Sequence, residues 1–269
     1  MVRSLALCVV MTLLTTTAAS AGVISGSEDS SQFGSLDQHK LSVCKTPGGV
    51  SEACGPAAAV NSFVFLEHKY PKVYDDSLVD LSGLGGPDFG EVLTGNDLGS
   101  DTFMGCGCGG TTWDDFYRGK KAYIDLMDPG STTYGQQQDP GAANLARALN
   151  VGADVEIYLQ FGSKAHFVTL TSITYDTVLQ DGTISYIDPL DGKSHTAGIF
   201  GNGASPGLGV NYTSPDGSFS DTGAISFGAL EIPTSSTPEP ATWALLMIGF
   251  GVTGAAARRA RRVRELAAV

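Results

Sequence analysis

The chain of 269 residues predicts an α+β fold with helices first and strands later. Residues 54–69 form a run of small and apolar residues that suits a buried helix, and 112–127 and 139–150 also have helical character. From residue 154 the chain instead shows short runs rich in Val, Ile, Thr, Tyr and Phe, which favour strands. Because helices and strands are segregated along the chain, we expect an N-terminal helix packed on a C-terminal antiparallel sheet.

The first 21 residues have the pattern of a secretory signal peptide. Arg3 supplies a positive charge, residues 5–14 are apolar, and Ala19-Ser20-Ala21 offers a small-residue cleavage site. The apolar run is too short to span a bilayer comfortably. The polar, Ser-rich residues 22–40 are interpreted as a flexible lead-in to the main domain.

The C-terminal end has the pattern of a membrane tether. The motif Pro238-Glu239-Pro240 precedes an apolar run over 241–257, which is about the minimum length for a spanning helix. Basic residues follow this run: Arg258, Arg259, Arg261, Arg262 and Arg264. Because such clusters stay on the cytoplasmic side, we expect the main body to lie outside the cytoplasm.

Together, Pro238-Glu239-Pro240, Trp243, the Gly249-Phe250-Gly251 run and the terminal arginines resemble a PEP-CTERM sorting signal. The resemblance implies a Gram-negative bacterium, an exosortase as partner and processing near the Pro-Glu-Pro motif. It also implies transient residence in the inner membrane, then export alongside exopolysaccharide to the cell surface or the extracellular matrix. The resemblance covers only the C-terminal end of the chain, with 234–237 as the linker before it. It indicates where the protein is sent and does not indicate an activity. A permanent single-span anchor is the alternative.

The charge of the main domain excludes nucleic acid as a partner. The whole chain carries a formal charge of −12, from 16 basic and 28 acidic residues. Without the two ends, 10 basic residues stand against 27 acidic ones, a net charge of about −17. Phosphate backbones and anionic lipids would be repelled by such a surface. An acidic surface also keeps an exported protein in solution, so it does not define a function.

Within the domain, expected over 41–233, helix 54–69 is apolar on almost all sides and must be enclosed. Residues 82–110 are Gly-rich without clear periodicity and are interpreted as an ordered loop or insertion. In the helix over 139–150, Asp139 is expected as the N-cap and Pro140 as a first-turn residue.

The strands are expected over 154–161, 166–175, 183–187 and 224–232. Asp181-Gly182 is a hairpin-turn signal that joins the second and third of them. The Gly-, Ser- and Asn-rich tract that ends near residue 222 reads as irregular.

The cysteines of the mature chain leave two readings of Cys54 open. Because an exported protein forms disulfides, Cys54 can pair with Cys44, Cys106 or Cys108. Cys106 and Cys108 lack the two-residue spacing typical of zinc sites, so no metal and no cofactor is expected. In the second reading, Cys54 is a nucleophile. It stands at the start of a helix, where backbone N–H groups favour a thiolate and can hold an oxyanion.

If Cys54 is a nucleophile, the sequence also offers a base and a group to orient that base. His166 stands where one expected strand begins, and Asp188 follows the end of the next. An antiparallel hairpin brings these two ends together, so Asp188 is expected to orient the imidazole. His195 is the rival base. His39 lies in the lead-in, and His68 is roughly 21 Å along the helix from Cys54.

The order of these residues resembles papain-like cysteine peptidases, closest to the bacteriocin-processing, double-glycine-type group. The resemblance rests on Cys54-Gly55-Pro56-Ala57-Ala58, Ala165-His166-Phe167-Val168 and Tyr186-Ile187-Asp188-Pro189. It implies a papain-like fold with Cys54 as nucleophile, His166 as general base and acid, and Asp188 as orienter. That group also has an oxyanion glutamine about six residues before the cysteine. Gly48 holds that position here, and the nearest glutamine is Gln38.

The sequence therefore predicts an exported, surface- or matrix-associated cysteine peptidase that hydrolyses peptide bonds. Two alternatives remain open. One is a non-catalytic surface or structural protein on a degenerate peptidase scaffold, and the other is an acyltransferase that uses the same three residues.

Overall fold

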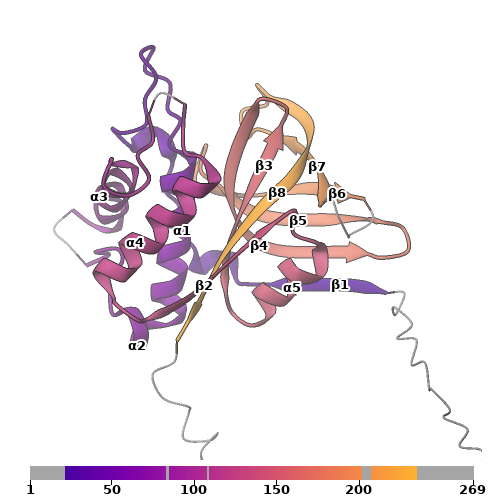
Figure 1. Cartoon of the computed structure of the whole chain (residues 1–269), viewed down its shortest axis with the longest axis horizontal. Coiled ribbons are helices and arrows are strands. Elements are labelled where there is room, and N and C mark those ends of the chain that lie inside the picture. Colours follow the sequence, from indigo (N-terminus) through magenta and orange to yellow (C-terminus); the bar gives the residue numbers. More distant parts are fainter. Residues whose placement is uncertain (1–21, 83–84, 108, 202–206, 235–269) are drawn as a thin grey trace, which may run out of the picture.

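The computed structural model describes residues 22–82, 85–107, 109–201 and 207–234. Figure 1 shows these residues as a helical layer beside a strongly curved sheet. The helices of this part are α1 Cys54–Lys69, α2 Pro71–Tyr74, α3 Pro87–Gly99, α4 Trp113–Met127 and α5 Ala142–Asn150. The strands are β1 Val23–Ser27, β2 Thr132–Gln138, β3 Asp154–Phe161, β4 Lys164–Asp176, β5 Asp181–Asp188, β6 Lys193–Phe200, β7 Leu208–Thr213 and β8 Ser220–Pro233.

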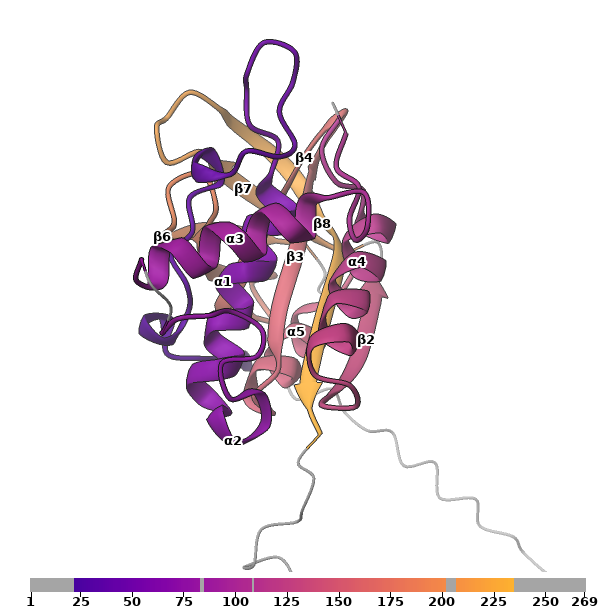
Figure 2. The ribbon, with the colours of Figure 1, turned by 90° about the vertical axis from the view of Figure 1, so that its left-hand side faces the viewer.

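The prediction of an α+β fold with N-terminal helices packed on an antiparallel sheet is confirmed. Helices α1 to α4 lie together on one side of the molecule, and Figure 2 shows α1, α3 and α4 in front of β3 and β8. Helix α5 lies apart from them, beside β1. The hairpin expected between the second and third predicted strands is present as β4 and β5. Its turn lies at 177–180, because Asp181 and Gly182, the predicted turn, already pair with Asp176 and Tyr175 of β4.

All strand pairs are antiparallel, and six of the strands close into a ring. The neighbours run β4, β3, β8, β7, β6 and β5, and β5 pairs again with β4. Strand β1 adds to β4, and β2 adds to β8. The ring is possible because β4 and β8 are long, so that each pairs with different neighbours along its length. The closure places the start of β4 close to the end of β5.

Two apolar cores follow from this arrangement. One fills the ring and the space under α5, with Ile157, Val168 and Ile184 among its members. The other lies between the helical layer and the outer face of the ring, where Phe116 stacks on Phe167 at 4.3 Å between ring centroids. Neighbouring residues of a strand therefore pack into different cores, because successive side chains point to opposite faces of a sheet.

Helix α1 is enclosed on nearly every side. All residues from Gly55 to Glu67 are buried, as its apolar composition predicts. The Thr169 hydroxyl of β4 donates a hydrogen bond of 2.8 Å to the carbonyl of Ala58, which fixes the helix against the sheet. At the far end, the Tyr70 hydroxyl donates to the carbonyl of Gly152 over 2.8 Å.

A buried cationic side chain joins α4 to α1 and the sheet. Lys120 Nζ lies 2.8 Å from Asp154, 2.5 Å from Glu156, within hydrogen-bond reach of Glu231, and 3.0 Å from the Ser62 hydroxyl. Burial opposes the charge of Lys120, but the three carboxylates outweigh it and raise the pKa of the ammonium well above its usual value. Carboxylates in this geometry can hold a metal ion; here the ammonium lies among them as their counter-ion.

The structure corrects the expectation of a flexible lead-in over 22–40. This segment contains β1, and its two short 3-10 turns, Ser30–Gln32 and Gln38–Lys40, lead towards α1. The Asn61 side chain accepts a hydrogen bond from the backbone N–H of Leu36 over 2.6 Å. The ordered structure of residues 22–40 could not be predicted from their polar composition, because it depends on contacts with distant parts of the chain.

The Gly-rich stretch 82–110 is also different from its prediction, because α3 lies inside it. Its glycines weaken helical propensity, but they allow close packing. A side chain at Gly95 would begin 2.7 Å from the Leu41 side chain, and one at Gly90 would collide with the carbonyl of Asp80. Tertiary contact therefore selects glycine at positions where a helical pattern calls for larger residues.

Two further predictions were wrong in detail, and one strand was not expected. Asp139 does not cap α5: its φ is +46°, its N–H bonds to Ser226 of β8, and Gly141 takes the N-cap position. The tract before residue 222 holds β6 and β7, whose buried residues alternate with glycine and polar residues. Strand β2 was not expected either, because TTYGQQQ is mostly polar.

Replacing Lys120 by Met is expected to destabilise the domain by about 3–5 kcal/mol, because three buried carboxylates lose their counter-ion. Lys121→Met is the matched control. Lys121 is on the same helix but half-exposed, in an ion pair with Asp125, so its loss should cost about 1 kcal/mol or less. Urea unfolding of both variants measures the difference, and equal losses would contradict the assigned role of Lys120.

Replacing Glu67 by Gln is expected to remove a pH dependence of stability. Burial raises the pKa of Glu67 to about 7, despite hydrogen bonds from the N–H groups of Leu78 and Val79. The folded state therefore keeps a proton that the unfolded chain releases above pH 4.5. The wild type should lose roughly 3 kcal/mol more than Glu67→Gln as pH rises from 4.5 to above 7. Urea unfolding of both proteins across this window tests it, and parallel curves would refute it.

Candidate active site

Cys54 is the first residue of α1 and keeps a free thiol. The described cysteines Cys44 and Cys106 form a disulfide, so of the three cysteines in the described part only Cys54 is unpaired. The N-cap residue Ala53 offers no side-chain hydrogen bond to the helix. The first-turn N–H groups of α1 therefore point from the helix end without a capping side chain, where they favour an anion.

His166 and Asp188 meet as the hairpin argument predicts. His166 is the third residue of β4, Asp188 is the last of β5, and the two strands pair at Thr169 and Ile187. His166 Nε2 lies 2.8 Å from Asp188 Oδ1. Asp188 is fully buried and also accepts hydrogen bonds from the Tyr212 hydroxyl at 2.8 Å and the Leu190 N–H at 2.9 Å. The carboxylate is thus held as an acceptor.

Cys54 lies beside His166, because both residues line the same cavity and Cys54 is among the groups that raise the pKa of the imidazole. Because Nε2 faces Asp188, the ring nitrogen left for Cys54 is Nδ1. Burial disfavours a charged ring, but the hydrogen bonds and charges of Asp188 and Cys54 outweigh it and raise the pKa of His166 to about 10. For Asp188 burial is likewise outweighed, by His166 above all, and the pKa of this carboxyl is lowered. These two shifts favour an imidazolium paired with the Asp188 carboxylate.

Gln38 reaches the same site in spite of its distance from Cys54 in the sequence. Its Nε2 donates to the Ser51 carbonyl at 3.0 Å, and its backbone N–H donates to the Pro189 carbonyl at 2.7 Å. Residues 39–50 form a loop that leaves Gln38 and Ser51 side by side. Gly48 lies within this loop, so no side chain comes to the site from the position where a glutamine is expected from the resemblance.

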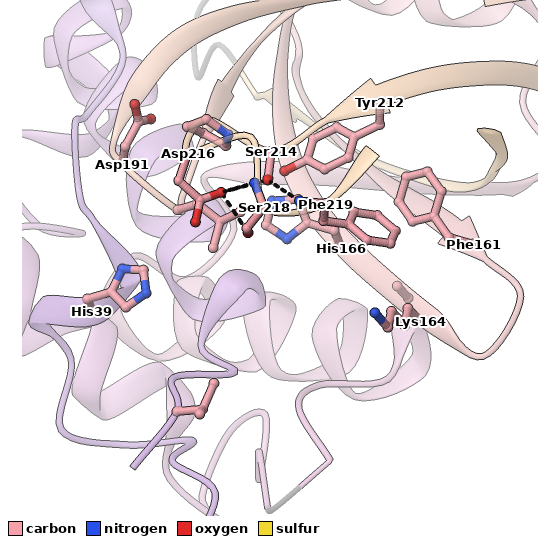
Figure 3. Close-up of a pocket in the computed structure, with 14 residues that line it drawn as sticks. His39, Phe161, Lys164, His166, Asp191, Tyr212, Ser214, Asp216, Ser218 and Phe219 are labelled. Atoms are coloured by element: carbon pink, nitrogen blue, oxygen red, sulfur yellow. Dashed lines mark hydrogen bonds between the residues drawn. The ribbon is translucent and has the colours of Figure 1, made fainter. Parts of the chain in front are cut away.

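Two cavities adjoin His166. The first, of about 420 Å³, is lined by Gln38, Glu52, Cys54, Thr111, Tyr158 and His166 among others. The second, of about 650 Å³, is more apolar and lies on the other side of the imidazole. Figure 3 shows His166 beneath the turn that carries Ser214, Asp216 and Ser218, with Phe161 and Phe219 to one side and His39 and Asp191 to the other.

The remaining histidines do not join Cys54. His195 Nε2 bonds to Asp191 at 3.0 Å, and His195 lines neither cavity. His39 is exposed and bonds to Asp37, and His68 bonds to the carbonyl of Gln32. The rival base is therefore placed away from the thiol.

Tyr212 belongs to the site and was not singled out from the sequence. Its hydroxyl bonds to Asp188, and its ring centroid lies 5.5 Å from that of His166. Burial, followed by the charge of Asp188, raises the pKa of the phenol well above its usual value, so it remains a donor. The buried alternation of Leu208, Val210 and Tyr212 was the available signal.

Comparison with known proteins concerns the C-terminal end. Residues 236–262 match the PEP-CTERM protein-sorting motif. The resemblance seen in the sequence is thereby confirmed, and the motif implies an exported protein that is anchored and sorted by its C-terminal end and processed by an exosortase. Curated protein sequences show no match to the chain.

The two predicted membrane-directed segments, 1–21 and 241–257, lie outside the described residues, as do the sorting residues from Pro238 to Arg262. Within the described residues, no helix is both long and apolar enough to cross a membrane.

Replacing His166 by Gln is expected to slow alkylation of Cys54 by iodoacetamide at pH 6 by about 10- to 100-fold, because the thiolate loses its cationic partner. His195→Gln is the control and should react like the wild type, since His195 lines neither cavity. Mass spectrometry of the modified Cys54 peptide gives the rates. A similar rate in all three proteins would show that His166 does not activate the thiol.

Proposed function

We propose that the domain is a cysteine peptidase of papain-like fold, with Cys54, His166 and Asp188 as its catalytic residues. The observation that carries this proposal is the hydrogen bond between His166 and the buried Asp188, with the free thiol of Cys54 at the N-terminus of a buried helix and on the wall of the same cavity as His166. A nucleophile, a base and an orienting group in this relation define covalent acyl transfer. The domain would extend over about residues 22–233, with α3 and the Gly-rich segment as part of its fold.

In the first half of the reaction, the Cys54 thiolate attacks the carbonyl carbon of a peptide bond, and the C=O electron pair moves onto oxygen. In this proposal, the Cys54 N–H and the second N–H of Gln38 Nε2 hold this oxyanion. When the C–N bond breaks, the amine takes the proton of His166 Nδ1, and the acyl group remains on sulfur as a thioester.

In the second half, His166 removes a proton from water as the water oxygen attacks the thioester. The C–S bond breaks, the acid product leaves, and the imidazolium and the thiolate are restored. Asp188 keeps Nε2 protonated throughout, so that Nδ1 alone exchanges the proton. Tyr212 and the Leu190 N–H hold Asp188 in turn and act as positioning groups.

The experiment is hydrolysis of a panel of fluorogenic peptides by the exported form of the protein. Cys54→Ala is expected to abolish cleavage, and Gln38→Ala to lower kcat/KM by about 100- to 1000-fold through the loss of an oxyanion donor. Gln137→Ala, at an exposed position of β2, is the matched control and should leave kcat/KM unchanged.

Two results would contradict hydrolysis by this site. Cleavage that survives Cys54→Ala excludes the thiol as nucleophile. A product joined to an added amine, in place of a free acid, indicates an acyltransferase with the same residues.

A further inference from the structure

The cavity beside Cys54 contains unpaired polar atoms. The described residues hold eight buried side-chain nitrogen or oxygen atoms that have no hydrogen-bond partner. Three of them belong to residues that line this one cavity: Gln38 Oε1, Glu52 Oε2 and Thr111 Oγ1. A buried polar group without a partner costs about 1–3 kcal/mol, so three such groups on residues around one cavity favour a ligand that pairs with them.

The chemistry of these atoms specifies the ligand. Gln38 Oε1 and Glu52 Oε2 are acceptors, since the amide nitrogen of Gln38 is already identified by its bond to the Ser51 carbonyl. Thr111 Oγ1 accepts or donates. A group rich in N–H donors matches all three, and the Glu52 carboxylate favours a positive charge.

Glu52 is the carboxylate that this cavity offers. It stands two residues before Cys54, and its N–H donates to the Cys44 carbonyl at 2.8 Å, so the disulfide-linked loop fixes its position. Gly110 lies opposite, where a side chain would begin 3.7 Å from Glu52 Cβ. Gly110 and Glu52 are therefore neighbours on the wall of the same cavity.

The lysine that lines this cavity does not neutralise Glu52. Lys164 lines both cavities, but its Nζ lies 4.8 Å from the ring centroid of Phe219. Phe219 lines only the second cavity, and Figure 3 shows Lys164 on the wall of that cavity. The ammonium of Lys164 is therefore engaged on the far side of His166.

We propose that the 420 Å³ cavity is a specificity pocket for a cationic side chain, and that the substrate carries lysine or arginine next to the scissile bond. Glu52 is its specificity-determining residue, and Gln38 Oε1 and Thr111 accept the remaining N–H groups. The proposal rests on the proposed peptidase function for its substrate. The recognition of a cation beside Cys54 can be tested without turnover.

The first experiment measures kcat/KM for peptides that differ only by Lys, Gln or Glu beside the cleaved bond. The wild type is expected to favour Lys over Gln by about tenfold or more, as a close ion pair requires. Glu52→Gln should remove this preference. Asp191→Asn, which removes one charge on the second cavity, should keep it. A preference that persists in Glu52→Gln overturns the proposal.

The second experiment measures modification of Cys54 by three methanethiosulfonates that carry an aminoethyl, a methyl or a sulfonatoethyl group. Work at 0.15 M salt or above limits the influence of distant charges to about 8 Å. The aminoethyl reagent should exceed the methyl reagent in rate, and Glu52→Gln should lower this ratio by about tenfold. The methyl reagent alone reports whether the variant keeps a folded, reactive site.

The two experiments separate the two proposals. A rate ratio that depends on Glu52, without any Cys54-dependent cleavage, supports the cationic pocket and contradicts the peptidase. Cleavage that depends on Cys54, with a rate ratio unchanged in Glu52→Gln, supports the peptidase and overturns the pocket.

Discussion

The enclosure of helix α1 is the constraint on which the rest of the structure depends. A helix that is apolar on all sides must be covered on all sides, and here the sheet covers one face while α3 and α4 cover the other. Thr169 and the Lys120 cluster then fix its depth and its rotation. Since Cys54 is the first residue of this helix, the position of the thiol is set by core packing. A site that begins on a rigid element keeps its geometry more closely than one built on loops.

The sequence predicted the elements that show regular patterns and missed those defined by distant contacts. Helix α1, strand β3 and the pairing of β4 with β5 have strong local signals and were expected, although the turn between β4 and β5 comes before Asp181-Gly182. Helix α3 was missed because its glycines serve close packing against other segments. Strands β6 and β7 were missed because one face of each carries glycine and polar residues. In both cases the information lies in contacts between residues far apart in the chain.

In the candidate site too, what depends on local pattern was predictable and what depends on distant contacts was not. Chain order and antiparallel geometry were enough to bring Asp188 to His166, because a hairpin fixes the relation of its two ends. The spacing to Cys54 along the sequence did not predict that Gln38 reaches the site. Residues 39–50 form a loop that returns at Ser51, where Gln38 and Ser51 are hydrogen-bonded to each other. Nothing in the local sequence marks Glu52 as a cleft residue, since its role depends on the loop that the disulfide holds. Residues on one hairpin were thus predictable, and residues assembled from several loops were not.

The long helix α1 also separates the two ends of the molecule. Cys54 lies at one end of it, and near the other end Tyr70 touches Gly152, just before β3 begins beside the last residues of β8. The described chain leaves the domain there, at the lower end of β8 in Figure 1, and the sorting motif starts at residue 236. With about 1.5 Å per residue, the helix alone accounts for some 23 Å between the two ends. The C-terminal end of β8 therefore lies at the end of the domain opposite the Cys54 thiol. If the protein is held by its C-terminal tail, the cavity beside Cys54 therefore lies at the end of α1 away from the point of attachment.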